Sequence, residues 1–430
     1  MVIQDIYQDL KIDKPYGAWR HPHTTWKDAV FTNILVGTIF PVAKAKFHQY
    51  HPVEEREKAV ACIQEFRNGG SKNNTQVVAR GIRAWEKQAG CLIGEMDYKV
   101  PRPKNLIREW GIADVDPHKY APKQDITVKL NFPLSILQEG DMPSSNNNNN
   151  ERLPNRCVPI RFDNIATQLP QDIPLLIWFH GGGMTLGHAQ MDIESAVAVA
   201  GNKPCVVAFV EYSLAPEVPF PTPIEEALAT ISHFIELFPN HPSIHLGGIS
   251  AGGYFGAVCT MEIHRRYPGR LKSSLLAVPC TDPCCDSPSY RANANQFPYV
   301  DWIKWCWQSW LELPSPTPKD SSSPQDDEED QTNRSAWNAS PYKGTSLERL
   351  INPMVDPPTG LNGPDAPTIL VTTNRADMFY SEGIAFVHAL EKANAKVTHL
   401  DHNGSHWLGT FTDRAAHAEL MDHWHKMLFL

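Results

Sequence analysis

The stretch that decides the fold is Gly248-Ile249-Ser250-Ala251-Gly252-Gly253, which follows the apolar run Ile244-His245-Leu246. A Gly-x-Ser-x-Gly sequence between a buried strand and a helix forms a sharp turn that pushes the serine hydroxyl outward. Glycine at positions 248 and 252 gives the backbone room to bend that tightly. We therefore predict that Ser250 is a nucleophile at a strand-to-helix turn.

A second glycine-rich stretch, His180-Gly181-Gly182-Gly183, follows the apolar residues 175–179. Such a loop supplies backbone N–H groups that stabilise the oxyanion formed when a serine attacks a carbonyl. We predict that Gly182, Gly183 and Ala251 are the oxyanion donors and that Gly181 mainly permits the turn. Glycine runs also occur in ordinary turns. The order of the two motifs, each after an apolar run, favours an acyl-transfer site.

Downstream of Pro174, short apolar segments alternate with longer segments of helical periodicity. We predict buried strands at 175–179, 205–211, 244–248, 274–278, 368–372 and 397–401, and helices at 223–238, 252–266 and 382–394. This alternation is typical of an α/β fold in which helices flank a mostly parallel central sheet. Ligands then bind at the carboxyl ends of the strands, which is where both glycine motifs fall.

A serine hydroxyl needs a base to take its proton and an acid to orient that base. The last predicted strand runs into the turn 403–406, which would present His406 at the carboxyl edge of the sheet, and we predict that His406 is the base. The strand at 368–372 runs into a loop that carries Asp377, the predicted acid. Glu382 is the main rival, although it is equally well explained as a first-turn acid opposite a helix dipole.

Other histidines near the end of the chain are weaker candidates for the base. His399 lies inside the last predicted strand and His402 lies just before the turn. His417, His423 and His425 fall on a predicted C-terminal helix, where no two of them are three or four residues apart. Because they share no helix face, they indicate neither a second base nor a metal site.

The chain has 430 residues, of which 42% are hydrophobic, and it can bury a large core as one domain with insertions. Its net charge is −9, with a strongly acidic run inside residues 319–334, and nothing indicates a basic surface for nucleic acid. The nine cysteines form neither a disulfide pattern nor a paired zinc pattern. The first 20 residues lack the apolar core of a signal peptide, so we expect a cytoplasmic protein.

Residues 1–122 lack the alternation of strands and helices and carry scattered large aromatic residues. We predict that 1–122 form a helical cap or lid and that 123–430 form the main domain; an independent N-terminal domain is the alternative for the first segment. Insertions near 138–156 and 314–335 are rich in Asn or in Pro, Ser and acids, and we predict that they are disordered. The apolar stretch 29–45 is too short to span a bilayer. A helix packed over the pocket and a weak contact with a lipid surface are its two interpretations.

Four tryptophans recur between residues 302 and 310 with helical spacing, at Trp302, Trp305, Trp307 and Trp310. Trp302 and Trp305 share one helix face. An ordinary buried helix and an aromatic wall of the substrate pocket are equally good interpretations of this segment.

Taken together, the motifs resemble the hormone-sensitive lipase family of α/β-hydrolases over roughly residues 126–430. The resemblance is carried by the stretches His180-Gly181-Gly182-Gly183, Glu211-Tyr212-Ser213-Leu214-Ala215-Pro216-Glu217 with Pro219-Phe220-Pro221, the serine turn at 248–253, Asp282-Pro283 with Ser289-Tyr290, and the loop 377–383. It implies the α/β-hydrolase fold with an N-terminal cap, a carboxylic ester hydrolase that uses Ser250, Asp377 and His406, and no cofactor. The chain departs from the family at Ile249, where an acid is common, and at Ser213, where arginine is common.

The leading functional interpretation is therefore a serine carboxylesterase or lipase that acts through an acyl-enzyme on small esters with short to medium acyl chains. An amide or formamide hydrolase would use the same residues, because the fold does not choose the substrate. A noncatalytic ligand receptor, as in the gibberellin receptors that resemble this family, is the alternative from a different class. The presence of all three residues in the order Ser250, Asp377, His406 favours an enzyme.

Overall fold

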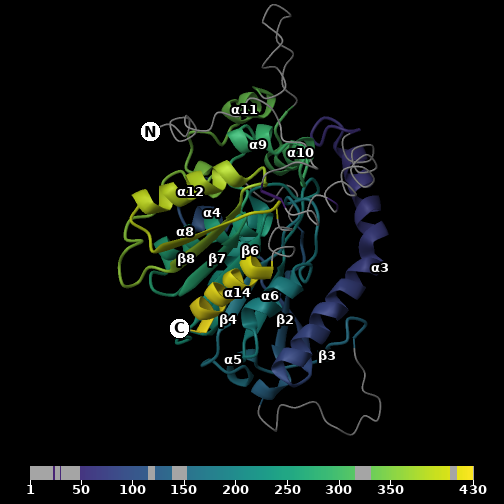
Figure 1. Ribbon diagram of the computed structural model, residues 1–430, viewed down its shortest axis with the longest axis vertical. Coiled ribbons are helices and arrows are strands. Elements are labelled where there is room, and N and C mark those ends of the chain that lie inside the picture. The colour runs from purple at the N-terminus through teal and green to yellow at the C-terminus, as the bar shows by residue number, and fades with distance from the viewer. Residues whose placement is uncertain are drawn as a thin grey trace, which may run out of the picture.

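A nine-stranded sheet runs through the protein in the order β3-β1-β2-β5-β4-β6-β7-β8-β9, with helices on both faces (Figure 1). The computed structural model describes residues 23–24, 30, 49–114, 122–137, 153–314, 331–406 and 414–429. The strands are β1 (Ile93–Val100), β2 (Ile126–Pro133), β3 (Val158–Pro159), β4 (Leu175–Phe179), β5 (Val206–Glu211), β6 (Ile244–Ile249), β7 (Ser273–Ala277), β8 (Thr368–Asn374) and β9 (Val397–His402).

The six strands from β4 to β9 run parallel to one another, and each lies within two residues of a predicted strand. Among the described strands only β2 runs in the opposite direction, because it pairs antiparallel with both β1 and β5, whereas β1 pairs parallel with β3. The prediction of a mostly parallel sheet flanked by helices is confirmed.

The helices cover the two faces of the sheet in two layers. The long helices are α3 (Arg56–Ala89), α6 (Ile193–Ala200), α7 (Thr222–Leu237), α8 (Ala251–Arg266), α10 (Val300–Leu311), α11 (Gln331–Asn338), α12 (Tyr380–Lys392) and α14 (Arg414–Phe429). Shorter segments are α4 (Leu106–Glu109), α5 (Ile165–Gln168), α9 (Pro288–Ala292), η4 (Leu134–Ile136) and η7 (Glu348–Leu350). Apolar side chains of α6 and α14 pack on one face of the sheet, and those of α7, α8 and α12 pack on the other.

Strand β4 shows why both faces can be covered. All five of its residues, Leu-Leu-Ile-Trp-Phe, are buried, and successive side chains point to opposite faces. Trp178 faces the α6 and α14 layer, where it meets Trp424 edge-on, whereas Phe179 faces α8 and stacks on Phe255. Burying an aromatic or aliphatic side chain of this size contributes about 1.5–3 kcal/mol.

The N-terminal part of the chain differs from the sequence prediction in one respect. Residues 93–100 form β1, which pairs with β2 along its whole length, so the sheet begins well before the predicted boundary at residue 122. The described part of 1–122 that precedes the sheet therefore ends before Ile93. Alternating burial along the second half of β1 is the period-2 signal of a half-buried strand, and the prediction overlooked it.

Helix α3 is the largest element of this N-terminal part and runs along one side of the molecule (Figure 1). It packs against α6, where Gly81 lies so close to Ile193 that a Cβ at position 81 would be 2.5 Å from Ile193 Cγ2. Its first half contacts α10 through Ala59 and Ile63, which cluster with Trp305 and Cys306. It ends at Gly90, which has the left-handed φ of 69° that favours glycine after a helix.

Several predictions fall outside the described residues. These are the stretch 29–45 apart from Val30, the Asn-rich insertion at 138–152, and the acidic insertion at 315–330. Among the helices that the structure does describe, none has the length and apolar composition that a bilayer-spanning helix needs.

Candidate active site

Ser250 lies at the turn between β6 and α8 in a backbone conformation that few non-glycine residues adopt. Its φ is 59° and its ψ is −120°. Strained conformations of this kind cost about 1–3 kcal/mol and persist where the surrounding structure enforces them. Here the Ser250 N–H donates to the carbonyl of Ala277 at 2.9 Å, and the Ser250 carbonyl accepts the N–H of Tyr254 at 3.0 Å. The sharp turn predicted at this position is therefore present.

The two glycines that flank this turn are required by close backbone contacts. A Cβ at Gly252 would lie 1.9 Å from the carbonyl oxygen of Phe179, at the end of β4. A Cβ at Gly248 would lie 2.4 Å from the carbonyl carbon and oxygen of Gly252. Both distances are far below van der Waals contact, so the start of α8 packs directly on the strand ends because positions 248 and 252 have no side chain.

The predicted base and acid lie together at the carboxyl ends of β8 and β9. His406 Nδ1 and Asp377 Oδ2 are 2.7 Å apart, and their side chains are only 3% and 1% exposed. The other carboxylate oxygen, Asp377 Oδ1, accepts the N–H of Phe379 at 3.1 Å. Asn374 donates from its side chain to the carbonyl of His406, and the ring of Phe379 meets the imidazole edge-on at 5.0 Å. The imidazole is therefore held on several sides.

Glu382, the rival acid, lies elsewhere. Its Oε1 accepts the N–H of Thr281 at 2.6 Å, and it is completely buried at the start of α12. Burial raises the pKa of Glu382 well above its ordinary value, so the neutral form is favoured. Two of the other histidines near the C-terminus bond elsewhere: a ring nitrogen of His399 lies 2.8 Å from the Thr373 hydroxyl, and one of His425 lies 3.3 Å from the Val199 carbonyl.

The glycine loop after β4 presents free N–H groups beside Ser250. Gly182 and Gly183 have φ values of 113° and 60°, which glycine adopts readily. Gly181 donates its N–H to Asp192 Oδ2 at 2.9 Å. Within the part of the chain that the structure describes, the N–H groups of Gly182, Gly183 and Ala251 have no hydrogen-bond acceptor. The sequence analysis predicted these same three N–H groups as candidate oxyanion donors.

His180, which precedes the glycines, has a structural role. Its ring stacks on Tyr212 with 4.2 Å between ring centroids, and the Tyr212 hydroxyl donates to the His180 carbonyl at 2.7 Å. Burial lowers the pKa of His180 to about 3, so the ring is neutral at physiological pH. It holds the loop against β5 and is not a competing base.

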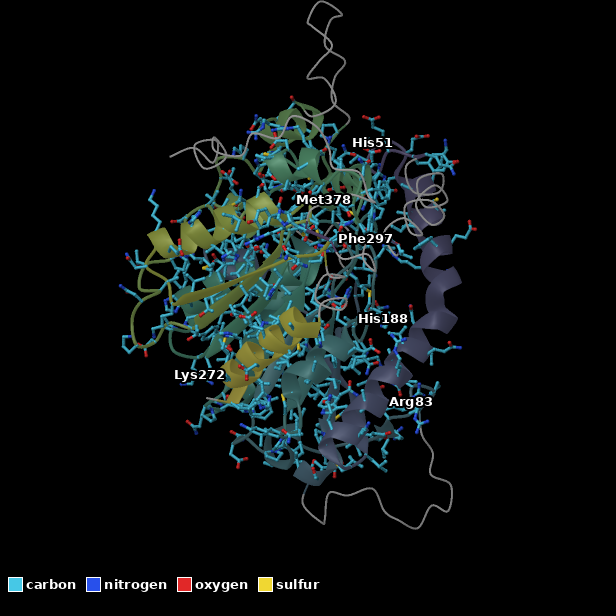
Figure 2. All side chains as sticks on the ribbon, viewed as in Figure 1. His51, Arg83, His188, Lys272, Phe297 and Met378 are labelled. Carbon is cyan, nitrogen blue, oxygen red and sulfur yellow. The ribbon has the colours of Figure 1, made fainter. Side chains whose placement is uncertain are left out.

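Ser250 and His406 line one cavity of about 370 Å³. The remaining lining residues come from four segments: α3 (Val77 and Arg80), the glycine loop (Gly181, Gly182 and Gly183), the segment around the start of α6 (Met191, Asp192, Glu194 and Ser195) and the region of α10 (Phe297, Pro298, Trp302 and Ile303), together with Ile249. The ring centroid of Phe297, which is labelled in Figure 2, lies 6.2 Å from that of the His406 imidazole. A larger cavity of about 760 Å³ lies beside β1 and includes none of the predicted catalytic residues.

The tryptophans of α10 separate into two groups. Trp302 lines the cavity, so it forms part of an aromatic wall. Trp305 instead packs against α3 and donates its indole N–H to the carbonyl of Tyr50 at 3.2 Å. Trp307 and Trp310 are fully buried against Tyr254. The two interpretations of this helix therefore apply to different residues.

One group of side chains in the described residues has the composition of a metal site. Ligand atoms of Asp282, Cys284 and Asp286 lie within 4.8 Å of one another. Asp286 is paired with the guanidinium of Arg334, with 2.7 Å from Nη2 to Oδ1, and Asp282 Oδ1 accepts the N–H of Cys284 at 3.0 Å. Because these acids already have partners, the geometry assigns no ion to them.

Comparison with known proteins identifies relatives of the region that contains this site. A family model described as alpha/beta hydrolase fold matches residues 176–407, which include Ser250, Asp377 and His406. An AB hydrolase superfamily protein of Schizosaccharomyces pombe is 32% identical over 239 residues, which are 52% of this chain and 60% of that protein. Carboxylesterase NlhH of Mycobacterium tuberculosis is 33% identical over 129 residues, 29% of this chain and 40% of the relative. The match thus spans less than two thirds of the length of either relative.

Two solved structures of similar shape are named as esterases. A bacterial heroin esterase superposes with a TM-score of 0.54 at 18% identity and covers 86% of this chain and 93% of its own. A hyperthermophilic esterase from the archaeon Pyrobaculum calidifontis gives a TM-score of 0.51 at 17% identity, with coverages of 85% and 92%. At these identities the likeness establishes the shared fold.

Proposed function

The chain belongs to the hormone-sensitive lipase family of α/β-hydrolases, and from this premise we propose that it is a serine carboxylic ester hydrolase. The observation that carries the proposal is the buried pair of Asp377 and His406, 2.7 Å apart, of which His406 lines the same cavity as the strained Ser250. A serine at a sharp turn, a base held by an acid, and unpaired N–H groups beside them are the parts that acyl transfer needs.

In the proposed reaction the Ser250 hydroxyl attacks the ester carbonyl while His406 Nε2 accepts the hydroxyl proton. Asp377 holds the ring through Nδ1–H and stabilises the imidazolium that forms. The negative charge on the former carbonyl oxygen is stabilised by the N–H groups of Gly182, Gly183 and Ala251. Collapse of the tetrahedral intermediate breaks the C–O bond, and the alcohol leaves with the proton from His406. Water then attacks the acyl-enzyme by the same steps and releases the acid.

The lining of the cavity supports esters with short to medium acyl chains. Phe297, Pro298, Trp302 and Ile303 supply an apolar and aromatic wall, which favours an acyl chain over a charged group. A volume of about 370 Å³ is enough for a small ester and leaves limited space for a long chain. We further propose that the N-terminal segment acts as a cap, which is supported by the contribution of Val77 and Arg80 of α3 to the cavity wall.

The first test is covalent labelling of the folded protein with a fluorophosphonate, followed by peptide mass mapping. We expect a single adduct on Ser250 that is absent from Ser250→Ala. Ser232→Ala is the matched control, because Ser232 is a buried serine of α7 that lines no part of this cavity. A folded protein whose Ser250 remains unlabelled would contradict the proposal and favour a receptor.

A second test separates the hydrolase classes. We expect p-nitrophenyl esters of two to eight acyl carbons to be hydrolysed, with kcat/KM falling at longer chains, and the matching p-nitroanilides to react far more slowly. Equal or faster turnover of anilides would favour the amidase, and activity confined to emulsified long-chain esters would favour a lipase. Either outcome would keep Ser250 as the proposed nucleophile but would change the proposed class of substrate.

A further inference from the structure

Asp192 occupies the position before helix α6 and faces the catalytic cavity. Aspartate at this position commonly accepts an N–H of its own helix. Here the side chain makes no such bond, and its Oδ2 instead accepts the N–H of Gly181 at 2.9 Å. The carboxylate therefore ties the start of α6 to the glycine loop, eleven positions earlier in the chain.

The bonded glycine lies directly against the serine turn. A Cβ at Gly181 would be 3.6 Å from Ser250 Cβ and 3.2 Å from the carbonyl oxygen of Ile249. The next two residues, Gly182 and Gly183, have positive φ values and no side chains, so their own preferences fix the loop only weakly. The directions of their N–H groups must be fixed by contacts at the two ends of the loop.

The contacts at the far end of the loop come from the backbone. The carbonyl of Gly182 accepts the N–H groups of Leu186 at 2.9 Å and Thr185 at 3.2 Å. At the near end, the Gly181 N–H has Asp192 as its partner. Loss of this partner would leave a buried N–H unsatisfied, at a cost comparable to a lost hydrogen bond, and would free the first glycine to rotate.

We propose that Asp192 is a positioning residue for the oxyanion loop: by accepting the Gly181 N–H, its carboxylate orients the N–H groups of Gly182 and Gly183 toward the oxygen of the tetrahedral intermediate. The inference rests on the proposed ester hydrolysis. It also implies that the Gly181 N–H itself makes no bond to substrate, because that N–H already has an acceptor.

The proposal predicts that catalysis depends on the presence of a side-chain oxygen at position 192 and does not depend on its negative charge. An asparagine side chain keeps an oxygen at the position of Oδ2, so Asp192→Asn should preserve the hydrogen bond to Gly181. Asp192→Ala removes the acceptor. Asn164→Ala is the matched control, since it also deletes a side-chain acceptor for a backbone N–H, that of Ala166 at 3.0 Å, at a helix start that lines no part of the cavity.

The experiment measures kcat, KM and the inhibition constant of an alkyl trifluoromethyl ketone, which forms an oxyanion when a serine adds to it. Enzyme concentrations are normalised by fluorophosphonate titration, and thermal unfolding reports the fold. For Asp192→Ala we expect kcat to fall by roughly 10- to 100-fold, KM to change by less than about 3-fold, and the ketone to bind correspondingly more weakly. Asp192→Asn should stay within about 3-fold of the wild type for all three quantities, as should Asn164→Ala.

Three results would overturn the inference. The first is Asp192→Ala with wild-type kcat and ketone affinity. The second is Asp192→Asn with the same loss as Asp192→Ala, which would assign the effect to charge. The third is a rise in KM with unchanged kcat, which would place Asp192 in substrate binding. If the wild type hydrolyses esters and labels at Ser250, these outcomes concern Asp192 alone, whereas an inactive and unlabelled wild type would overturn the proposed function together with this inference.

Discussion

Replacing Asp377 by asparagine tests the proposed triad most sharply, because the structure dictates which way the new amide must face. Oδ1 of Asp377 accepts the N–H of Phe379 at 3.1 Å, so the carbonyl oxygen of the introduced amide will take that position. The amide NH₂ then points at His406 Nδ1, which lies 2.7 Å from the present Oδ2. An NH₂ group donates, so Nδ1 must become the acceptor and the imidazole proton must move to Nε2. A ring protonated at Nε2 cannot accept the proton of Ser250.

The wrong tautomer, together with loss of the charge that stabilises the imidazolium, is expected to lower kcat by roughly 10³- to 10⁴-fold near neutral pH. This corresponds to about 4–5.5 kcal/mol of transition-state stabilisation. The assay is steady-state hydrolysis of a p-nitrophenyl ester, with thermal unfolding to show that the side chain, which is 1% exposed, is still accommodated. Asp377→Asn with more than about a tenth of the wild-type kcat would refute the assignment of the acid.

Two variants control for the loss of a nearby carboxylate. Asp401→Asn changes an acid on the adjacent strand β9 that pairs with Arg375 and not with His406. Glu382→Gln changes the rival acid, which is bonded to Thr281 and is favoured in its neutral form by burial. Both should retain kcat/KM within about 3-fold. A large loss in Glu382→Gln alone would instead support the rival.

Three further outcomes are expected. Gly252→Ala should lower the free energy of unfolding by about 3 kcal/mol and abolish hydrolysis, because the new Cβ would lie 1.9 Å from the carbonyl oxygen of Phe179; denaturant unfolding measures the change. Arg67→Ala should destabilise by about 1–3 kcal/mol and lower kcat, since Arg67 donates from Nε at 2.9 Å and Nη2 at 2.5 Å to the carbonyl of Thr185, beside the glycine loop. Burial raises the pKa of Asp192 to about 6, so its ionisation costs more in the folded than in the unfolded chain. Relative to Asp192→Asn, the wild type should therefore lose up to about 3 kcal/mol of stability as pH rises from about 4 to 6, measured by urea unfolding at each pH.

The predictions for Gly252→Ala and Arg67→Ala each have a control on the same helix. Gly256→Ala also lies in α8, but its Cβ would meet only Cδ2 of Leu276, at 2.7 Å, and a flexible side-chain end can move. Arg83→Ala removes an exposed arginine of α3 whose position on that helix is visible in Figure 2. Wild-type stability in Gly252→Ala, or equal losses in the two arginine variants, would contradict the reasoning. For Asp192, a stability difference that is constant with pH would contradict the raised pKa.

The parallel core of the fold could be read from the sequence because its strands are short apolar runs bounded by turns and helices. The predicted strand at 244–248 is β6, and the predicted helix at 252–266 is α8 to within one residue. Periodicity carries this information directly, since a strand buried on both faces consists of a nearly continuous run of apolar residues. The prediction overlooked β1 because it relied on continuous apolar runs, and the charged residues Glu95, Asp97 and Lys99 leave no such run in this strand.

The proposed catalytic residues could be placed together from the sequence for a related reason. Ser250, Asp377 and His406 each follow a strand of one parallel sheet, so their order in the chain already brings them to one edge. Asp192 gave no such signal: an acid before a helix is explained by capping, and only the structure shows that its side chain turns to Gly181. The contribution of α3 to the cavity wall could not be predicted either, because the place where a helix crosses a sheet depends on tertiary packing.

Helix α3 links the substrate cavity to the oxyanion loop. Val77 lines the cavity, and Gly81 lets the helix approach Ile193, the residue after Asp192, more closely than any side chain would allow. Arg67 lies earlier in the same helix, and its side chain donates a hydrogen bond to the carbonyl of Thr185 at the far end of the glycine loop. A substrate that displaced α3 would therefore disturb both ends of the glycine loop, which we propose stabilises the oxyanion. Acyl-chain selectivity and kcat should consequently change together in variants of α3, whereas a pocket formed by the main domain alone would let them vary independently.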